Sequence, residues 1–137
     1  METTAMRNQV PRTWPAACCA AAVLALALPA DAATLRLRCE RRLDPARSTI
    51  SVDAQGVAPN ALFSARVISG TRLVTARPLA ALGDEVEFDF DSNPNDIRAG
   101  ATAIPVNFIQ GGRVRAAIFN ANGQVVAGPG NATCEVR

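Results

Sequence analysis

The clearest pattern in this chain is an alternation of apolar and acidic residues over positions 85–91. Val86, Phe88 and Phe90 occupy every second position, and Glu or Asp occupies the others. An alternation with a period of two is typical of a strand that buries one face and exposes the other. The segment therefore predicts a central strand with two phenylalanines on its inner face and a row of carboxylates on its outer face.

Shorter alternations of the same kind cover the rest of the chain after residue 33. They predict further strands over 34–42, 48–54, 61–69, 71–76, 104–108, 114–118, 124–127 and 133–136. The pairs Gly111-Gly112 and Asn122-Gly123 are hairpin turn signals, and Asp96 is expected to cap one helical turn. About seven to nine short strands without a long amphipathic helix indicate an all-β sandwich or small barrel. We expect a single antiparallel β-sandwich.

Residues 1–32 have the composition of a secretory signal peptide and are expected not to belong to the fold. Arg7 and Arg12 precede an apolar run over 16–28, and Ala30 and Ala32 are small residues of the kind that a signal peptidase recognises. A membrane anchor is disfavoured because a spanning helix needs about 20 apolar residues. The sequence therefore predicts a secreted or periplasmic domain over 33–137, with no membrane span in the mature chain.

Two cysteines remain after that cut, Cys39 near one end of the domain and Cys134 near the other. In an oxidising compartment a single pair is expected to form a disulfide, and two buried free thiols are the alternative. Closing so long a loop contributes on the order of 4–5 kcal/mol to the free energy of unfolding in the chain-entropy model.

The segment 56–67, GVAPNALFSARV, resembles the turn and strand of fibronectin type III and related immunoglobulin-like modules. In those modules a Gly-Leu-x-Pro-Gly connection precedes an aromatic-x-Val-x-Val strand, whereas here Val57 replaces Leu and Asn60 replaces Gly. The resemblance implies an immunoglobulin-like sandwich. The mature chain is also similar to small secreted bacterial proteins, which implies a compartment but no activity, because a fold does not by itself determine function.

Several catalytic chemistries are excluded by residue types that the chain lacks. It contains no His, Lys or Tyr. Without His there is no imidazole base or serine–histidine pair, and without Lys there is no Schiff base. The usual zinc and copper ligands are likewise missing, apart from thiols expected to be in a disulfide. We therefore expect a protein that is not an enzyme and has no cofactor other than calcium.

The first candidate site is a calcium site that follows the strand over 85–91. Its candidate ligands are Asp89, Asp91, Asn93, Asn95 and Asp96. Calcium takes about six to eight oxygen ligands, and this spacing resembles the opening of a D-x-D-x-N calcium loop. Pro94 and Gly100 stand where an EF-hand needs Gly and Glu, which excludes an EF-hand. The alternative is that the same residues form a turn, a helix cap and solvated strand positions.

The second candidate is an anion-binding strip formed by Arg36, Arg38 and Arg42, with Arg41 and Arg47 nearby. Arg36 and Arg38 share one strand face and are suited to an anionic surface or polysaccharide. The alternative is that this face forms cross-strand ion pairs with the acidic strand, each of which contributes little.

One aromatic residue, Phe119, is out of phase with the inward positions Val114, Ala116 and Ile118. It is therefore expected either on the surface or as a further core residue. Single-stranded nucleic acid would need several exposed aromatic side chains for stacking, so no nucleic-acid partner is expected.

The sequence predicts a non-enzymatic binding or structural module whose partner is unknown and is expected to be another envelope or extracellular protein. Two alternatives remain open. One is a calcium-stabilised adhesion or matrix domain, and the other is an inhibitor of a secreted enzyme.

Overall fold

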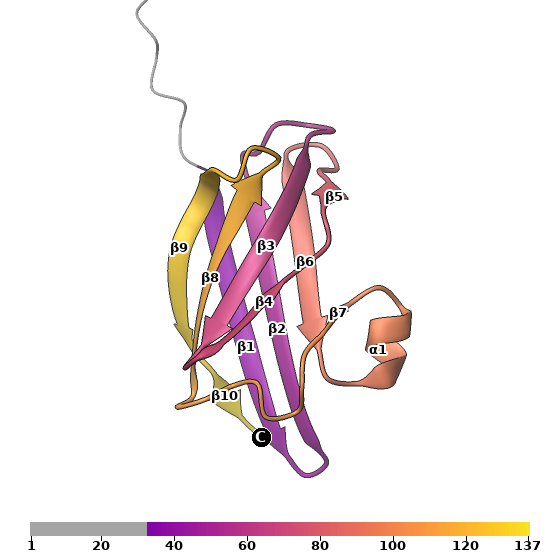
Figure 1. Ribbon diagram of the computed structural model, residues 1–137, viewed down its shortest axis with the longest axis vertical. Coiled ribbons are helices and arrows are strands. Elements are labelled where there is room, and N and C mark those ends of the chain that lie inside the picture. Colours follow the sequence, from indigo (N-terminus) through magenta and orange to yellow (C-terminus); the bar gives the residue numbers. More distant parts are fainter. Residues whose placement is uncertain (1–32) are drawn as a thin grey trace, which may run out of the picture.

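The computed structural model describes residues 33–137 and shows a mostly β molecule with two sheets (Figure 1). The β2 sheet has the strand order β10-β1-β2-β6-β7, and the β8 sheet has the order β4-β3-β8-β9, with β5 paired to β3. The elements are β1 Thr34–Leu43, β2 Ala46–Gln55, β3 Leu62–Ser69, β4 Arg72–Thr75, β5 Leu79–Ala80, β6 Glu85–Asp91, α1 Pro94–Arg98, β7 Thr102–Ala103, β8 Arg113–Asn120, β9 Val125–Thr133 and β10 Glu135–Val136. The predicted signal peptide lies outside the described residues.

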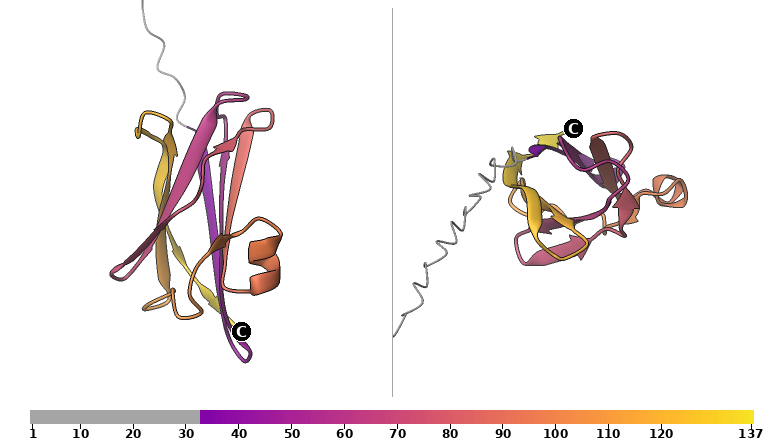
Figure 2. Two further views of the ribbon diagram at one scale, coloured as in Figure 1. Left: turned by 45° about the vertical axis from the view of Figure 1, so that its right-hand side comes forward. Right: turned by 90° about the horizontal axis from the view of Figure 1, so that it is seen from above.

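The core lies between the two sheets, which enclose a common interior when viewed from above (Figure 2). The alternation that predicted β6 is confirmed, because Val86, Phe88 and Phe90 are buried. They are in register with Ala54, Val52 and Ile50 of β2, which are also buried. The β8 sheet contributes Phe63, Ala65, Val67, Val114, Ala116 and Ile118 to the same core. Burial of each large apolar side chain contributes about 1.5–3 kcal/mol to the free energy of unfolding.

β1 joins the two sheets along one side of the molecule. Its start is bridged in parallel to β9 through Ala33 and Ala127, and Glu40 further along is in parallel register with Glu135 of β10. The chain therefore leaves the β8 sheet after β9 and enters the β2 sheet as β10. Cys134 lies between these strands and forms a disulfide with Cys39 of β1, as predicted.

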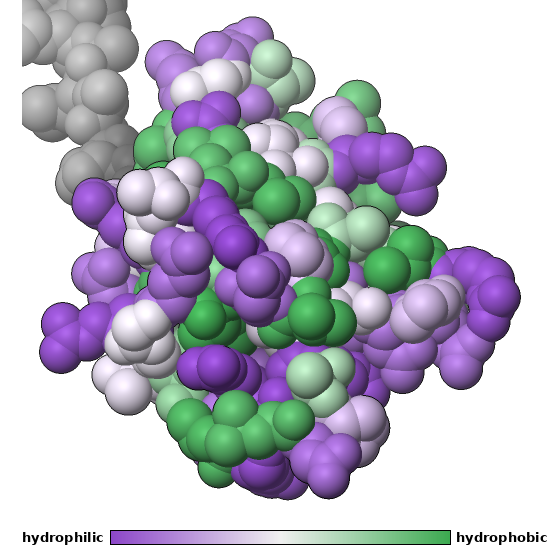
Figure 3. Space-filling model, turned by 60° about the horizontal axis from the view of Figure 1, so that its bottom comes forward, coloured by the Kyte–Doolittle hydropathy of each residue, from purple (hydrophilic) through white to green (hydrophobic). Residues whose placement is uncertain are grey.

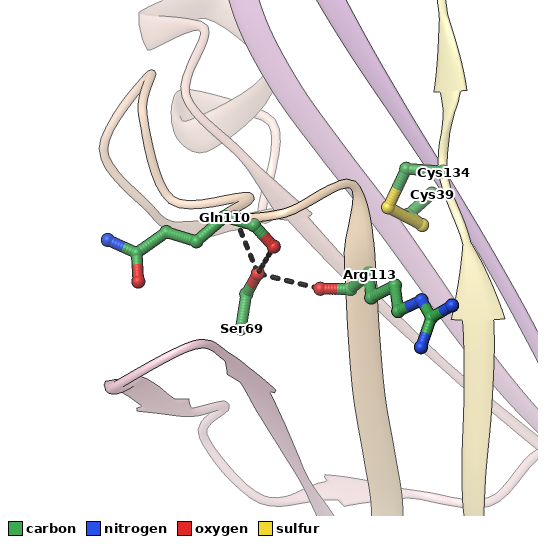
Figure 4. The surroundings of a disulfide bond; sticks show 5 residues. All are labelled: Cys39, Ser69, Gln110, Arg113 and Cys134. Atoms are coloured by element: carbon green, nitrogen blue, oxygen red, sulfur yellow. Dashed lines mark hydrogen bonds between the residues drawn. A yellow bond between two sulfur atoms is a disulfide. The ribbon is translucent and has the colours of Figure 1, made fainter.

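A buried serine fixes the turn next to this disulfide (Figure 4). The Ser69 hydroxyl, at the end of β3, accepts a hydrogen bond from the Gln110 amide at 2.7 Å and donates one to the Arg113 carbonyl at 2.7 Å. The Cys134 amide donates to the Gly112 carbonyl at 2.8 Å. The turn before β8 is thus tied both to β3 and to the junction between β9 and β10.

The prediction of a strand over 104–108 is wrong, because the structure has a loop there. Pro105 has no amide hydrogen to donate to a sheet, and the Phe108 amide donates to the Pro105 carbonyl at 2.9 Å, which closes a turn. Ile104 and Phe108 are nevertheless buried, whereas Val106 between them is 48% exposed. The apolar spacing that predicts a strand here comes instead from two core residues in a loop.

Three other features differ from the prediction: the cap of α1, the extent of β9 and the number of strands. The cap of α1 is Asn93 and not Asp96, and Pro94 occupies the first turn, where its lack of an amide hydrogen costs nothing. β9 continues through Gly128, Pro129 and Gly130, which had indicated a turn. There are ten strands rather than seven to nine among the described residues, because β5, β7 and β10 have two residues each and are too short to show an alternation.

Within residues 33–137 no helix has the length and apolar character needed to cross a membrane.

Candidate functional site

The outer face of the β8 sheet carries cationic and apolar side chains and no carboxylate. Its four main strands, β3, β4, β8 and β9, contain no Asp or Glu. Alternate positions on β3 and β8 are buried in the core, so their neighbours face outward. The outward residues of these two strands are Ser64, Arg66, Ile68, Arg113, Arg115, Ala117 and Phe119. Within residues 33–137, none of the three arginines in this set lies in a salt bridge.

The centre of this face is a shallow hollow of about 210 Å³, called below the Arg66–Phe119 hollow. The guanidinium of Arg66 lies over the ring of Phe119, with the carbon of the guanidinium 4.7 Å from the ring centroid. Such a contact contributes about 0.5–1 kcal/mol at an exposed site. The lining consists of Arg66, Ile68, Arg115, Ala116, Ala117, Phe119, Val125 and Pro129. The hollow is therefore apolar inside, with cationic side chains among its lining.

An irregularity in β9 shapes one wall of the hollow. Ala116 is paired with Gly130 and Ile118 with Ala127, so β9 has an extra residue opposite β8. Gly128 lies in this bulge with φ +84, and a Cβ there would be 3.0 Å from the Ala116 carbonyl oxygen, so the position requires glycine. The bulge lies next to Pro129, which lines the hollow.

A larger hollow of about 480 Å³ lies where β1 meets the end of β9 and β10. Its charged residues already neutralise one another, because Arg137 pairs with Glu40 at 3.5 Å and with Glu135 at 3.2 Å. Arg38, which also lines it, pairs with Asp53 at 3.5 Å. A charged ligand would therefore find less unpaired charge in this hollow than an anion finds on the outer face of the β8 sheet.

The predicted anion-binding strip lies along β1 of the β2 sheet and is partly paired. Arg38 pairs with Asp53 of β2, and Arg42 pairs with Glu40 at 3.2 Å. Arg36 is in register with Asp53 across the same strand pair. The acids of β6 are not adjacent to these arginines, since β2 lies between β1 and β6.

The predicted calcium ligands are engaged by groups within the chain. Arg47 donates to both carboxylate oxygens of Asp91, at 2.9 and 2.5 Å, and to Asp96 at 2.9 Å. Asp89 accepts from the Ser51 hydroxyl at 2.6 Å, the Asn93 side chain caps α1, and Asn95 pairs with Arg98. Across the part of the chain that the structure describes, no group of three or more His, Cys, Asp or Glu is placed to hold a metal ion. The calcium prediction finds no support in this arrangement.

The cluster of Arg47, Asp91 and Asp96 joins β2, β6 and α1. Burial alone would raise the pKa of Asp91, whose side chain is 5% exposed. The hydrogen bonds from Arg47 and from the Asn93 and Ser92 amides, together with the charge of Arg47, outweigh this effect and lower the pKa. The pKa of Arg47 is raised, chiefly by its hydrogen bond to Asp91. This cluster acts as a structural clamp.

The outer face of β6 has the opposite electrostatic character to the β8 sheet. Burial raises the pKa of Glu87, and the like charges of Asp89, Asp53 and Glu85 raise it further. Asp53 is almost buried, and its Oδ1 atom has no hydrogen-bond partner among the described residues. The charge of Arg38 lowers the pKa of Glu87 but does not offset these effects. The outward residues Glu85, Glu87 and Asp89, called below the β6 strip, therefore form a region of excess negative charge.

Exposed apolar side chains also occur at the end of the molecule that carries the tip of the β1–β2 hairpin. Leu43 and Val136 are each 60% exposed there. Figure 3 views the molecule with this end turned forward and shows hydrophilic residues between the apolar areas. Single exposed apolar side chains of this kind are normal on protein surfaces, so this end carries less indication of a site than the hollow.

Comparisons with protein-family models, with curated proteins and with solved structures gave no match.

Of the residues of this site, the sequence singled out only Phe119, and it left that residue open between the surface and the core. Its local pattern gave no indication of Arg66, Ile68, Arg115 or Pro129. A signal was present, because the chain has no Asp or Glu over 54–83 or over 97–134. Those two acid-free segments supply the strands of the β8 sheet. Counting charge by segment rather than over the whole chain indicates a face with one sign of charge.

Proposed function

We propose that the chain is a secreted or periplasmic, non-enzymatic binding module that recognises an acidic partner. In this proposal the partner binds to the outer face of the β8 sheet and places an apolar group in the Arg66–Phe119 hollow. The observation that carries the proposal is this hollow on a face without carboxylates.

The strand order supports the proposal that the sandwich is immunoglobulin-like. The orders β1-β2-β6 and β3-β8-β9 correspond to strands A-B-E and C-F-G of such domains. β4 lies beside β3, as an added C′ strand does in the variable type. The outer face of the β8 sheet would then be the face of the C-F-G sheet.

The disulfide and the leader-like sequence support a location outside the cytosol. Structural disulfides persist in oxidising compartments and are rare where thiols are kept reduced. The Cys39–Cys134 disulfide fits such a compartment, and so does the apolar run over 16–28.

The chemistry of the hollow supports binding rather than catalysis. Its lining contains no hydroxyl, thiol or carboxylate side chain that would act as a nucleophile or base. Arginine forms charge-assisted, often bidentate hydrogen bonds with carboxylates. Aromatic and arginine side chains around a small pocket are also the residue types that contribute most to protein interfaces. The calcium-stabilised domain and the enzyme inhibitor are not favoured by a comparable feature of residues 33–137.

Peptide binding tests this proposal. The probe is a fluorescent peptide with one leucine between two aspartates, and the comparison peptide has asparagines in place of the aspartates. Fluorescence anisotropy is expected to detect weak binding of the acidic peptide only. Phe119→Ala and Arg66→Ala should each weaken it about tenfold or more.

Arg36→Ala is the matched control for that experiment, since Arg36 is exposed on a strand of the other sheet. It should bind the acidic peptide as the unmodified protein does. Equal binding of the two peptides, or binding that survives both Phe119→Ala and Arg66→Ala, would refute the proposal.

A further inference from the structure

The hollow fits an apolar side chain that is accompanied by carboxylates, and the chain itself presents such a group. Leu82 is 85% exposed, the highest value among the large apolar side chains that the structure describes. Asp84 and Glu85, which follow it closely, are also exposed. The segment 82–85, called below the Leu82 turn, therefore combines a projecting apolar group with two negative charges.

The Leu82 turn is held in a fixed shape by backbone hydrogen bonds. The Leu82 amide donates to the Glu85 carbonyl at 2.9 Å, and the Glu85 amide donates back to the Leu82 carbonyl at 3.2 Å. The Asp84 carbonyl accepts from the Gly56 and Val57 amides at 2.9 and 3.0 Å. Because the turn is already ordered, its docking costs little conformational entropy.

A molecule cannot place this turn in its own hollow. The turn connects β5, which pairs with β3 at the edge of the β8 sheet, to β6 of the β2 sheet. The hollow lies on the outer face of the β8 sheet, over β3, β8 and β9. None of residues 82–85 lines the hollow, and their backbone hydrogen bonds hold the turn at the end of the molecule where β5 leads into β6 (Figures 1 and 2). Any contact between them is therefore a contact between two copies.

We propose that the Leu82 turn of one copy docks in the Arg66–Phe119 hollow of a second copy. Leu82 fills the apolar interior, and the carboxylates of Asp84 and Glu85 lie against Arg66 and Arg115. This inference rests on the proposed function, because it names the partner of the same surface. The charges are complementary, since the face that receives the turn has no carboxylate.

The proposed contact joins two different surfaces, so one copy uses its turn and its hollow on two neighbours. Heterologous contacts of this kind produce open chains, or closed rings where the rotation permits. A contact made by one turn is smaller than the roughly 1,000 Å² that stable interfaces bury. It is therefore weak and depends on concentration, and its ion pairs weaken as salt is added.

Sedimentation analysis of the full secreted chain tests the proposal. At low salt the weight-average mass is expected to rise with protein concentration, and added sodium chloride should lower it. Leu82→Ala and Asp84→Arg alter only exposed side chains of the turn, and each should leave a monomer. Phe119→Ala and Arg66→Glu alter the hollow and should do the same. Leu43→Ala removes another strongly exposed leucine and should associate as the unmodified protein does.

A mixing experiment separates this contact from unspecific association. Asp84→Arg retains an intact hollow, and Arg66→Glu retains an intact turn. An equimolar mixture of these two monomers should form a one-to-one complex that grows no further. A protein that stays monomeric at low salt and high concentration, or a mixture that forms no complex, would overturn the inference.

The peptide experiment distinguishes this failure from a failure of the proposed function. If the unmodified protein binds the acidic peptide but never associates, the hollow recognises a different acidic protein and only the inference is wrong. If the protein neither associates nor binds the peptide, both proposals fail. If association persists in Leu82→Ala and Asp84→Arg, another surface is responsible and the inference is again wrong.

Discussion

Phe119 has its ring on an outer face, whereas the other four phenylalanines of the chain are at most 4% exposed. Its phase in the sequence is consistent with this difference, because the inward positions of β8 are 114, 116 and 118, although the sequence left a core position open as well. The phase did not reveal Arg66, which reaches Phe119 only because β3 pairs with β8. A single residue can thus be assigned to a face from local pattern, but its neighbours there depend on strand order.

Glu87 provides a prediction at the scale of one residue. The folded protein holds its pKa above the ordinary value. The stabilisation linked to this shift is therefore fully present below the unfolded pKa of glutamate, about 4.3. It is lost as the pH rises through the folded pKa of Glu87. Glu87→Gln removes this loss, so we expect a melting temperature about 1–3 °C higher at pH 7. Thermal melting followed by circular dichroism measures it.

The pH dependence supplies the control for this substitution. At about pH 3 Glu87 is protonated in both states, and the variant and the unmodified protein should melt together. A variant that is less stable at pH 7 would contradict the repulsion argued for the β6 strip.

At the scale of elements, two segments of the chain show where local pattern misleads. The residues over 104–108 alternate as a strand does, but Pro105 prevents sheet pairing, and the segment packs Ile104 and Phe108 from a loop. For α1, the side chain of Asp96 by itself predicts that this residue is the cap. Pro94 points to Asn93 instead, because proline favours the first position of a helix and the cap is the residue before it.

The clamp of Arg47 on β6 and α1 gives the prediction at this scale. Arg47→Ala leaves Asp91, with its 5% exposed side chain, without its cation and should lower the free energy of unfolding by about 2–4 kcal/mol. Asp96→Ala removes a partner that is 46% exposed and should cost less than about 1 kcal/mol. Urea denaturation at pH 7 measures both values.

Acid distinguishes the clamp from a simple packing effect. The lowered pKa of Asp91 means that its contribution to stability is present above the unfolded pKa, about 3.9, and is lost as the pH falls through the folded pKa. The difference between Arg47→Ala and the unmodified protein should therefore shrink as the pH falls below about 4. Equal costs for the two substitutions at pH 7 would argue against the clamp.

At the scale of the whole molecule, the overall plan was accessible from sequence and the hollow was not. Alternating segments and the positions of Cys39 and Cys134 predicted a mostly β domain tied end to end. The hollow depends on the shift of register in β9 and on the side-by-side placement of β3, β8 and β9. Such placements join distant segments, and no local pattern contains them.

Removal of the disulfide gives the prediction at this scale. Cys39 and Cys134 are separated by 95 positions, so replacing both with alanine should lower the free energy of unfolding by about 4–5 kcal/mol. For a domain of this size the melting temperature should fall by about 15 °C or more. Comparison of the oxidised and reduced unmodified protein should give a similar decrease, and equal melting temperatures would show that the sheets hold the ends without the bond.

The position of this bond also decides how the domain would respond to mechanical force. A pull on its two ends would be transmitted through β1 to Cys39, across the sulfur atoms and out through Cys134. Only the residues over 33–38 and 135–137 lie outside the loop that the disulfide closes, so residues 40–133, which form most of both sheets, would carry almost no tension. The domain would then behave as an inextensible link for as long as its surroundings keep the bond oxidised.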